Sequence, residues 1–174
     1  MGSYNFLDTD QIIEQATNMT IPSIFEAEGE KGFRQVEGQV LDSVHAYVRC
    51  VVSTGGGIVE RMENWSKLQT GIVVWLDVEP ETIIQRLEAA EGGIAGRPLL
   101  AESEDPAGTL RALLEKRKSF YSQADVCIKV EPDMNVEDVA FCVVKDIHDY
   151  IDENPPAWKL AKAKAQAEGL DWVQ

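Results

Sequence analysis

Short apolar stretches alternate with helix-forming stretches along most of this chain, and the alternation limits the folds that it can adopt. Segments 4–7, 48–54, 71–78 and 126–130 each have the length and apolar character of a strand. Segment 71–78, GIVVWLDV, is apolar on both faces, as expected of a parallel strand that helices cover on its two sides. The sequence therefore predicts an α/β domain with a mostly parallel sheet.

Helical periodicity marks most of the segments between these strands. Asp8 or Thr9 can cap a helix that begins near Gln11, because both side chains accept hydrogen bonds from free backbone amides. Segment 91–106 mixes glycine, proline and charge, which predicts a mobile loop. Further helices are predicted over residues 21–29, 33–44, 80–90, 107–123 and 136–151.

The length and composition fit one domain. The 174 residues are 44% hydrophobic, which is enough for a substantial core. We place the domain at residues 1–153, because Asn154, Pro155 and Pro156 interrupt the last helix, and residues 154–174 are predicted to form a helical or loose tail. The net charge of −14, from 16 basic and 30 acidic residues, argues against nucleic-acid binding. No segment is long and apolar enough to cross a membrane.

Three cysteines bear on redox and metal chemistry. Cys50, Cys127 and Cys142 are odd in number, lie far apart and sit in apolar runs. This pattern favours buried reduced thiols over redox or metal roles. The first ten residues show no targeting pattern.

Candidate ligand-binding residues lie at or just after the carboxyl ends of three predicted strands. Ligands of parallel sheets bind beyond these ends. The sequence places Asp8–Asp10 after the first strand, Gly55–Gly57 after the second and Asp77 near the end of the third. Asp8 and Asp10 can divide two tasks, with one carboxylate in a metal shell and the other accepting a hydroxyl proton, whereas helix capping needs only one of them. A phosphate-binding P-loop reads G-x-x-x-x-G-K-[ST], and the triple glycine is followed by apolar and acidic residues instead.

Three arginines are candidates for binding an anion. Arg34 lies one helical turn before Glu37, and such a pair either decorates a solvated face or serves a site. Arg117 falls on an apolar helical stripe, so it must extend to solvent, form an ion pair or face a ligand. Arg97 lies in GGIAGRPLL, where it is either an ordinary surface residue or part of a lid that neutralises phosphate charge.

The motifs together resemble those of the shikimate kinase family. The stretches FLDTD, IFEAEGEKGFRQVE, VVSTGGG, GRPLL and RKSFY occur in the family's order, and the resemblance runs from Tyr4 to about Ile151. It implies a three-layer P-loop-kinase-like fold that uses ATP and Mg²⁺ to convert shikimate into shikimate 3-phosphate in aromatic amino acid biosynthesis. The dipeptide Asn64-Trp65 and the segment GIVVWLDV are most similar to plastid enzymes of plants and algae, which implies a plastid location; otherwise we expect a cytoplasmic one.

The resemblance also implies roles for individual residues. Asp8 would help to organise Mg²⁺, and Asp10 would bind the shikimate hydroxyls and act as base or orient the attacking 3-hydroxyl. Glu37 would orient an arginine and contact the substrate side. Two arginines, Arg34 and Arg117, would grip the shikimate carboxylate, Arg97 would reach the transferred phosphate, and Gly55, Gly56 and Gly57 would bring bare backbone against the carbocyclic substrate.

The nucleotide half of the family pattern is missing from this sequence. The family has a strand, a P-loop and a helix upstream of the DTD motif, and no G-x-x-x-x-G-K-[ST] occurs anywhere here. The segment EPDMNVED also lacks the arginine that the family tends to place near adenine. We therefore expect a fold without its first, central strand, an inactive or nearly inactive chain, and self-association through unpaired strand edges. The alternatives are a non-catalytic binding or regulatory protein and another small-metabolite kinase.

Overall fold

The structure, a computed structural model, describes residues 4–90, 92–101, 103–156, 159–160, 162, 164 and 167–168. The chain divides into two compact units, residues 1–132 and residues 133–174. The first unit contains all the candidate site residues and, among the described residues, all the strands.

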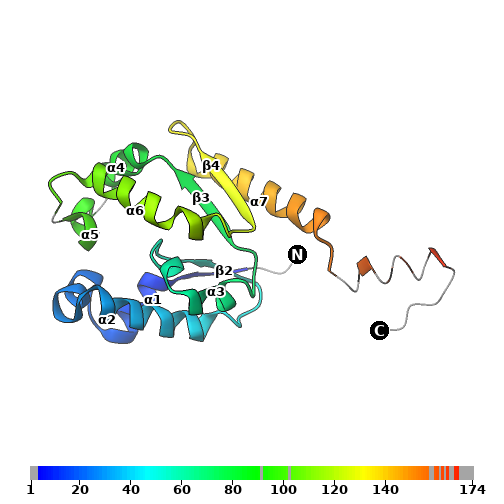
Figure 1. Cartoon of the computed structure of the whole chain (residues 1–174), viewed down its shortest axis with the longest axis horizontal. Helices are drawn as coiled ribbons and strands as arrows, with labels where there is room; N and C mark the ends of the chain where they lie inside the picture. The colour runs from blue at the N-terminus through cyan, green and yellow to red at the C-terminus, as the bar shows by residue number, and fades with distance from the viewer. Residues whose placement is uncertain are drawn as a thin grey trace. The chain divides into compact units, whose positions relative to one another are not determined.

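Four parallel strands form two separate sheets in the first unit (Figure 1). Strand β1 (Asn5–Asp8) pairs with β2 (Cys50–Ser53), with Asp8 opposite Ser53. Strand β3 (Val74–Val78) pairs with β4 (Val126–Val130), with Asp77 opposite Lys129. The four predicted strands and their parallel pairing are confirmed, and among the described residues β2 and β3 do not pair with each other.

Two helices pack beside the first sheet. Helix α1 (Thr9–Thr17) begins at the N-cap Asp8, whose side chain accepts from the amides of Asp10 and Gln11. Helix α2 (Ile21–Val44) joins the two helices predicted over 21–29 and 33–44, with a kink at Gly29 (φ 67°) between them. A glycine suits this kink because it adopts positive φ without steric cost. The two helices bury Ile13, Ile24, Phe33 and Val40 between them.

A short turn connects β2 to the next helix and carries a second core. The 3₁₀ turn η1 (Ile58–Glu60) follows the triple glycine, and helix α3 (Met62–Leu68) follows the turn. Neither element was predicted from the sequence. Both are fixed by burial, because Ile58, Val59 and Trp65 pack with Leu41 of α2 in one apolar cluster.

The remaining helices of this unit flank the second sheet. Helix α4 (Pro80–Ala89) and helix α6 (Pro106–Tyr121) confirm the helices predicted over 80–90 and 107–123. The prediction of a loop over 91–106 is partly wrong, because η2 (Ile94–Gly96) and α5 (Pro98–Ala101) lie within it. Pro98 is suited to a first helical position, and Leu100 is buried, so this short helix is anchored by its apolar side.

The predicted burial of some strand residues is wrong. Leu76 of β3 is 47% exposed and Val51 of β2 is 55% exposed, so the helices of this unit do not fully cover both faces of these strands. The cysteines are free but less buried than predicted, since Cys50 and Cys142 are half-buried and Cys127 is exposed. In β4 the residues at 126, 128 and 130 are buried, and the period of two therefore turns Cys127 outward.

The second unit contains one described long helix, α7 (Val136–Glu153), as predicted. Asn135 caps it in a capping box with Asp138, an arrangement that satisfies two free backbone amides. Most of the tail at 154–174 lies outside the described residues, and a domain boundary after residue 153 stays a prediction. Over the part of the chain that the structure describes, none of the helices has the length and apolarity needed to span a bilayer.

Candidate functional site

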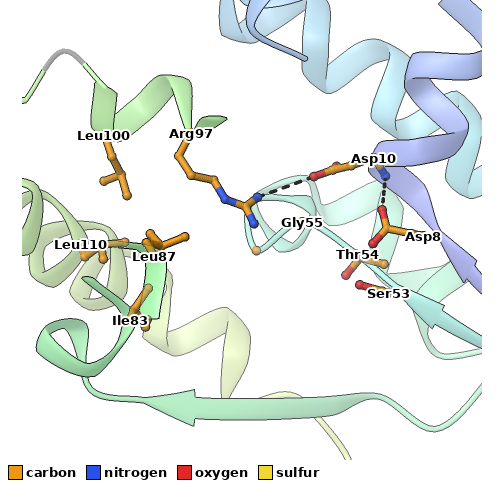
Figure 2. Close-up of a pocket in the computed structure, with 11 residues that line it drawn as sticks. Asp8, Asp10, Ser53, Thr54, Gly55, Ile83, Leu87, Arg97, Leu100 and Leu110 are labelled. Carbon is orange, nitrogen blue, oxygen red and sulfur yellow. Dashed lines mark hydrogen bonds and ion pairs between the residues drawn. The ribbon is translucent and has the colours of Figure 1, made fainter. Parts of the chain in front are cut away.

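A cavity of about 330 Å³ opens at the carboxyl ends of β1 and β2 (Figure 2). Its polar lining consists of residues at and just after the ends of these two strands together with Arg97, and its apolar lining comes from α4, α5 and α6. In Figure 2, Arg97 extends across the opening toward Asp10. The lining residues are Asp8, Asp10, Ser53, Thr54, Gly55, Gly56, Ile83, Leu87, Arg97, Leu100 and Leu110.

The two aspartates after β1 have different tasks in the structure. Asp8 caps the N-terminus of α1, and its Oδ1 accepts a hydrogen bond from the Asp10 amide at 2.9 Å. Asp10 is left to face the cavity, and its Oδ1 is buried with no hydrogen-bond partner among the described residues. Burial raises the pKa of Asp10, the nearby Asp8 carboxylate adds to the rise, and Arg97, whose Nη1 lies 3.9 Å from Asp10 Oδ2, partly offsets it.

The pair of Arg34 and Glu37 is present in α2, and it is buried rather than solvated. Nη1 of Arg34 donates to both Glu37 carboxylate oxygens at 3.0 Å, and Nη2 donates to Glu30 at 3.2 Å. Glu37 is fully buried, whereas Glu30 is 48% exposed. Burial raises the pKa of Glu37, and the charge and hydrogen bonds of Arg34 work against that rise. The geometry is that of an arginine whose guanidinium is held in one orientation.

The triple glycine makes room for side chains of other elements. A Cβ on Gly57 would overlap the guanidinium of Arg34, and one on Gly56 would lie 2.9 Å from the Tyr121 hydroxyl. A Cβ on Gly55 would lie 3.2 Å from Glu37 Oε1 and 3.7 Å from Asp10 Oδ1. None of these three glycines adopts a positive φ, so it is the absence of a side chain that matters here. This is a reason for the glycines that the sequence alone did not reveal.

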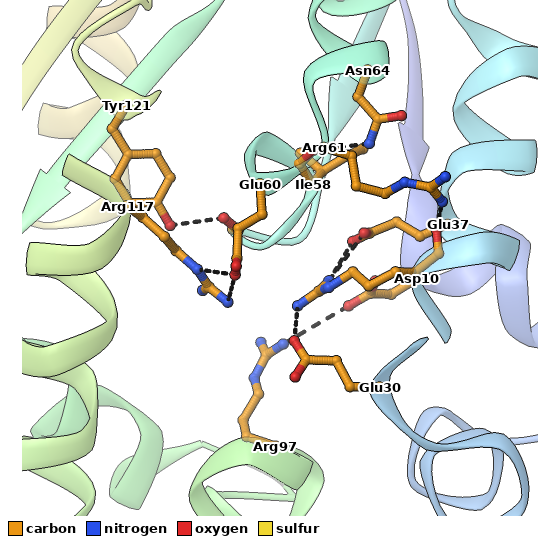
Figure 3. A network of polar contacts seen from close by, with 12 residues as sticks. Asp10, Glu30, Glu37, Ile58, Glu60, Arg61, Asn64, Arg97, Arg117 and Tyr121 are labelled. Atoms are coloured by element: carbon orange, nitrogen blue, oxygen red, sulfur yellow. Dashed lines mark hydrogen bonds and ion pairs between the residues drawn. The ribbon is translucent and has the colours of Figure 1, made fainter. Parts of the chain in front are cut away.

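Arg117 of α6 is brought to the same turn from far along the chain. Its side chain is only 8% exposed, and its Nε donates to Glu60 Oε1 at 2.8 Å. Tyr121, one turn further on in α6, donates to the Gly56 carbonyl at 2.8 Å and stacks on Trp75. Figure 3 shows Arg117 and Arg97 directed toward the space that Asp10 and Glu30 border. The sequence allowed Arg117 to extend to solvent, form an ion pair or face a ligand, and the structure shows an ion pair.

Several residues that hold this turn in place were not identified as site residues from the sequence. Asn64 donates to the Ile58 carbonyl at 2.9 Å, and Trp65 donates to the Val59 carbonyl at 3.0 Å. Arg61 donates to the Arg34 carbonyl at 3.0 Å and so links the turn to α2. The sequence signal that could have identified them is their position directly after a strand end and a glycine turn.

The predicted site residues therefore fall into two adjoining groups. Asp8, Asp10, Gly55, Gly56 and Arg97 line the cavity, and Arg34, Glu37, Gly57 and Arg117 form a charged cluster beside it. Gly55, which faces both Asp10 and Glu37, lies where the groups meet. Asp77 belongs to neither group, because it pairs with Lys129 on the neighbouring strand at 3.5 Å.

The oxygen donors of the cavity suit Mg²⁺. Within the described ranges, no group of three or more His, Cys, Asp or Glu side chains is placed to hold a metal ion by itself. Magnesium, however, keeps several waters and is usually bound by one or two carboxylates together with substrate phosphates. Asp8 and Asp10, with the hydroxyls of Ser53 and Thr54 in the same lining, are donors of this kind.

The fold defines the chain as a parallel α/β protein, and the charged cluster beside its cavity has the features of a site for a small anion: two oriented arginines, each paired with a carboxylate, next to a glycine turn. Comparison with known proteins narrows this class. The family model for shikimate kinase matches residues 1–148. The chain is 46% identical over 156 residues to a shikimate kinase of Synechococcus elongatus, covering 87% of this chain and 80% of that protein. It is 51% identical over 128 residues to one from Synechococcus sp. strain RCC307, covering 74% of this chain and 64% of that protein.

A solved structure agrees with these matches. The shikimate kinase of Acinetobacter baumannii, in complex with shikimate, aligns with a TM-score of 0.74 at 36% identity, covering 87% of this chain and 80% of that chain. This chain belongs to the shikimate kinase family. The resemblance drawn from the motifs and the P-loop-kinase-like α/β fold are both confirmed.

Proposed function

We propose that this chain binds shikimate in the charged cluster beside Gly55–Gly57, as the acceptor half of a shikimate kinase site. The observation that carries the proposal is the convergence of Arg34 and Arg117 on one glycine turn, each held by a carboxylate. Guanidinium groups match carboxylates in shape and charge, so an oriented pair suits the acid group of shikimate. Membership of the family and the shikimate named with the Acinetobacter protein support this choice of ligand.

The same arrangement supports a role for Asp10 as the group that binds the shikimate hydroxyls and accepts or orients the proton of the 3-hydroxyl. A general base works best when its pKa is near the pH of the reaction. Burial moves the pKa of Asp10 in that direction, and its Oδ1 has no protein donor among the described residues. Arg97, on the opposite side of the cavity, is placed to neutralise a phosphate at this point.

For the phosphate donor, the family reaction uses ATP with Mg²⁺, which neutralises charge on the phosphates when it is bound. We propose that Asp8 helps to hold the ion. The sequence contains no G-x-x-x-x-G-K-[ST], so the loop that cradles ATP phosphates is not among these 174 residues. We therefore propose that this polypeptide binds shikimate but turns over little or no ATP by itself.

We also propose a plastid location, which is suggested by the plant- and algal-type segments.

We also propose self-association through the facing edges of β2 and β3. The two strands are each paired on one side only, among the residues described, and a cavity of about 230 Å³ is lined by residues of both, including Val52 and Val74. Unpaired strand edges present rows of backbone donors and acceptors to other chains.

Titration of the purified chain with shikimate tests the proposed function. We expect saturable binding in a calorimeter and, in a coupled assay with ATP and Mg²⁺, ADP release at background level. The variant Arg34→Met should lose at least about 100-fold in affinity, because it removes a charged group that donates to the ligand.

The matched control for this experiment is Arg111→Met. Arg111 lies on α6 and pairs with Glu81 at an exposed position outside the lining of the cavity. Its replacement should leave shikimate binding unchanged. Absence of binding by the unaltered chain, or equal binding by the Arg34 variant, would contradict the proposed function, whereas robust ATP turnover would contradict only the proposed lack of activity.

A further inference from the structure

Arg117 and Arg34 are held by carboxylates in different ways. Arg34 is held by Glu37, its neighbour on the same helix. Arg117 is held by Glu60, which ends η1 and comes 57 residues earlier in the chain. The two arginines of the charged cluster thus have separate carboxylate partners, and the partner of Arg117 comes from the segment that continues the glycine turn.

The contact between Glu60 and Arg117 uses one edge of the guanidinium. Nε of Arg117 donates to Glu60 Oε1 at 2.8 Å, and Nη2 lies 2.7 Å from the same oxygen. Nη2 is nevertheless buried without a hydrogen-bond acceptor among the described residues, because its N–H bonds are not directed at that oxygen. A guanidinium is planar with donors in fixed directions, so occupation of the Nε edge sets the plane and leaves the terminal nitrogens to another acceptor.

Glu60 is itself fixed and charged. Lys116 Nζ lies 2.5 Å from its second oxygen, and the Glu60 amide donates to the Gly57 carbonyl at 3.1 Å. Although partial burial raises the pKa of Glu60, hydrogen bonds from Lys116 and Arg117 outweigh it and lower that pKa below its ordinary value. The carboxylate is therefore ionised throughout the neutral pH range.

We propose that Glu60 is a positioning residue, which locks the Nε edge of Arg117 so that its terminal nitrogens face the carboxylate of the bound acid. The inference rests on the proposed function, because it assumes that Arg117 binds the shikimate carboxylate. The opposite role, a carboxylate that competes with the ligand for Arg117, would need Glu60 to occupy the terminal nitrogens as a bidentate partner. In the structure a single oxygen of Glu60 contacts Arg117 and lies near both Nε and Nη2, so Glu60 is not a bidentate partner of the two terminal nitrogens.

Glu60→Leu tests the proposal by removing the carboxylate. We expect shikimate to bind about 10-fold more weakly, since the loss of one hydrogen bond that orients the arginine is of that order. Glu60→Gln keeps an oxygen that can accept from Nε and should stay within about 3-fold of the unaltered chain. The matched control is Glu81→Leu. It removes the carboxylate partner of Arg111, which lies on α6 like Arg117, and it should leave the affinity for shikimate unchanged.

A second measurement separates positioning from a merely structural role. In ¹⁵N spectra of arginine side chains, the Nε–H signal of Arg117 should exchange slowly with solvent in the unaltered chain and in Glu60→Gln, and quickly in Glu60→Leu. Unchanged or tighter shikimate binding by Glu60→Leu, or weaker binding with an unchanged Arg117 signal, would overturn the proposal. If the unaltered chain binds no shikimate, the proposed function fails and this inference fails with it. If the unaltered chain binds shikimate and Glu60→Leu binds it equally well, only this inference fails.

Discussion

Replacing Glu37 by alanine is expected to destabilise the fold by about 3 kcal/mol, because removing one partner of a buried ion pair leaves the other charge uncompensated. Glu37 is fully buried against Gly55, and Arg34 is 13% exposed, so water can replace little of the lost interaction. The value lies at the low end for such pairs, since Arg34 keeps its contact with Glu30. Urea denaturation monitored by tryptophan fluorescence measures the change.

Glu30→Ala is the control for this prediction, because it removes the other carboxylate from the same arginine. Glu30 is 48% exposed, and exposed ion pairs contribute only about 0.2–1 kcal/mol. Should Glu37→Ala be too unstable to purify, Glu37→Gln keeps the volume and should show an intermediate loss. Equal effects of the Glu30 and Glu37 replacements would contradict the assignment of a buried, structural ion pair.

Asp10→Asn is expected to stabilise the protein while weakening shikimate binding. Burial and the neighbouring Asp8 raise the pKa of Asp10 above its ordinary value of 3.8, so the folded chain holds this proton more tightly than the unfolded chain. The contribution of Asp10 to stability is then full below pH 3.8 and is lost as the pH rises through the raised pKa. An uncharged asparagine removes this loss, and we expect the melting temperature at pH 7.5 to rise by roughly 2–4 °C, the shift that about 1 kcal/mol causes in a protein of this size.

The loss of binding should accompany this gain. A charge-assisted hydrogen bond to a ligand hydroxyl contributes about 1.5–3 kcal/mol, so Asp10→Asn should weaken shikimate binding by about 10- to 100-fold. The melting experiment repeated near pH 3.5 is the internal control, because the difference between variant and unaltered chain should shrink there. A lower melting temperature for the variant at pH 7.5, or unchanged shikimate affinity, would count against Asp10 as a site carboxylate.

Local spacing was enough to predict much of the fold and part of the site. The position of Arg34 three residues before Glu37 indicates an ion pair, and the structure contains it. The apolar stripe around Arg117 indicates that this arginine extends to solvent, forms an ion pair or faces a ligand, and the structure shows an ion pair. These features depend on helix geometry alone, which a sequence pattern contains.

Features that depend on distant contacts could not be predicted in this way. Nothing near Glu60 in the sequence indicates that it meets Arg117, since that contact is set by how α6 packs against η1. The helix α5 lies inside a glycine-rich segment and is stabilised by the burial of Leu100, which only the tertiary structure shows. The exposure of Leu76 similarly depends on which helices cover its sheet.

The central claim is that two oriented arginines bind the carboxylate of a small acid beside the triple glycine. It is tested most directly by calorimetric titration of the unaltered chain with shikimate and, side by side, with its methyl ester, which keeps the ring and hydroxyls but has no negative charge. Charge-assisted hydrogen bonds from Arg34 and Arg117 contribute about 1.5–3 kcal/mol each, so the ester should bind at least about 100-fold more weakly. Equal affinity for the acid and its ester would contradict the claim.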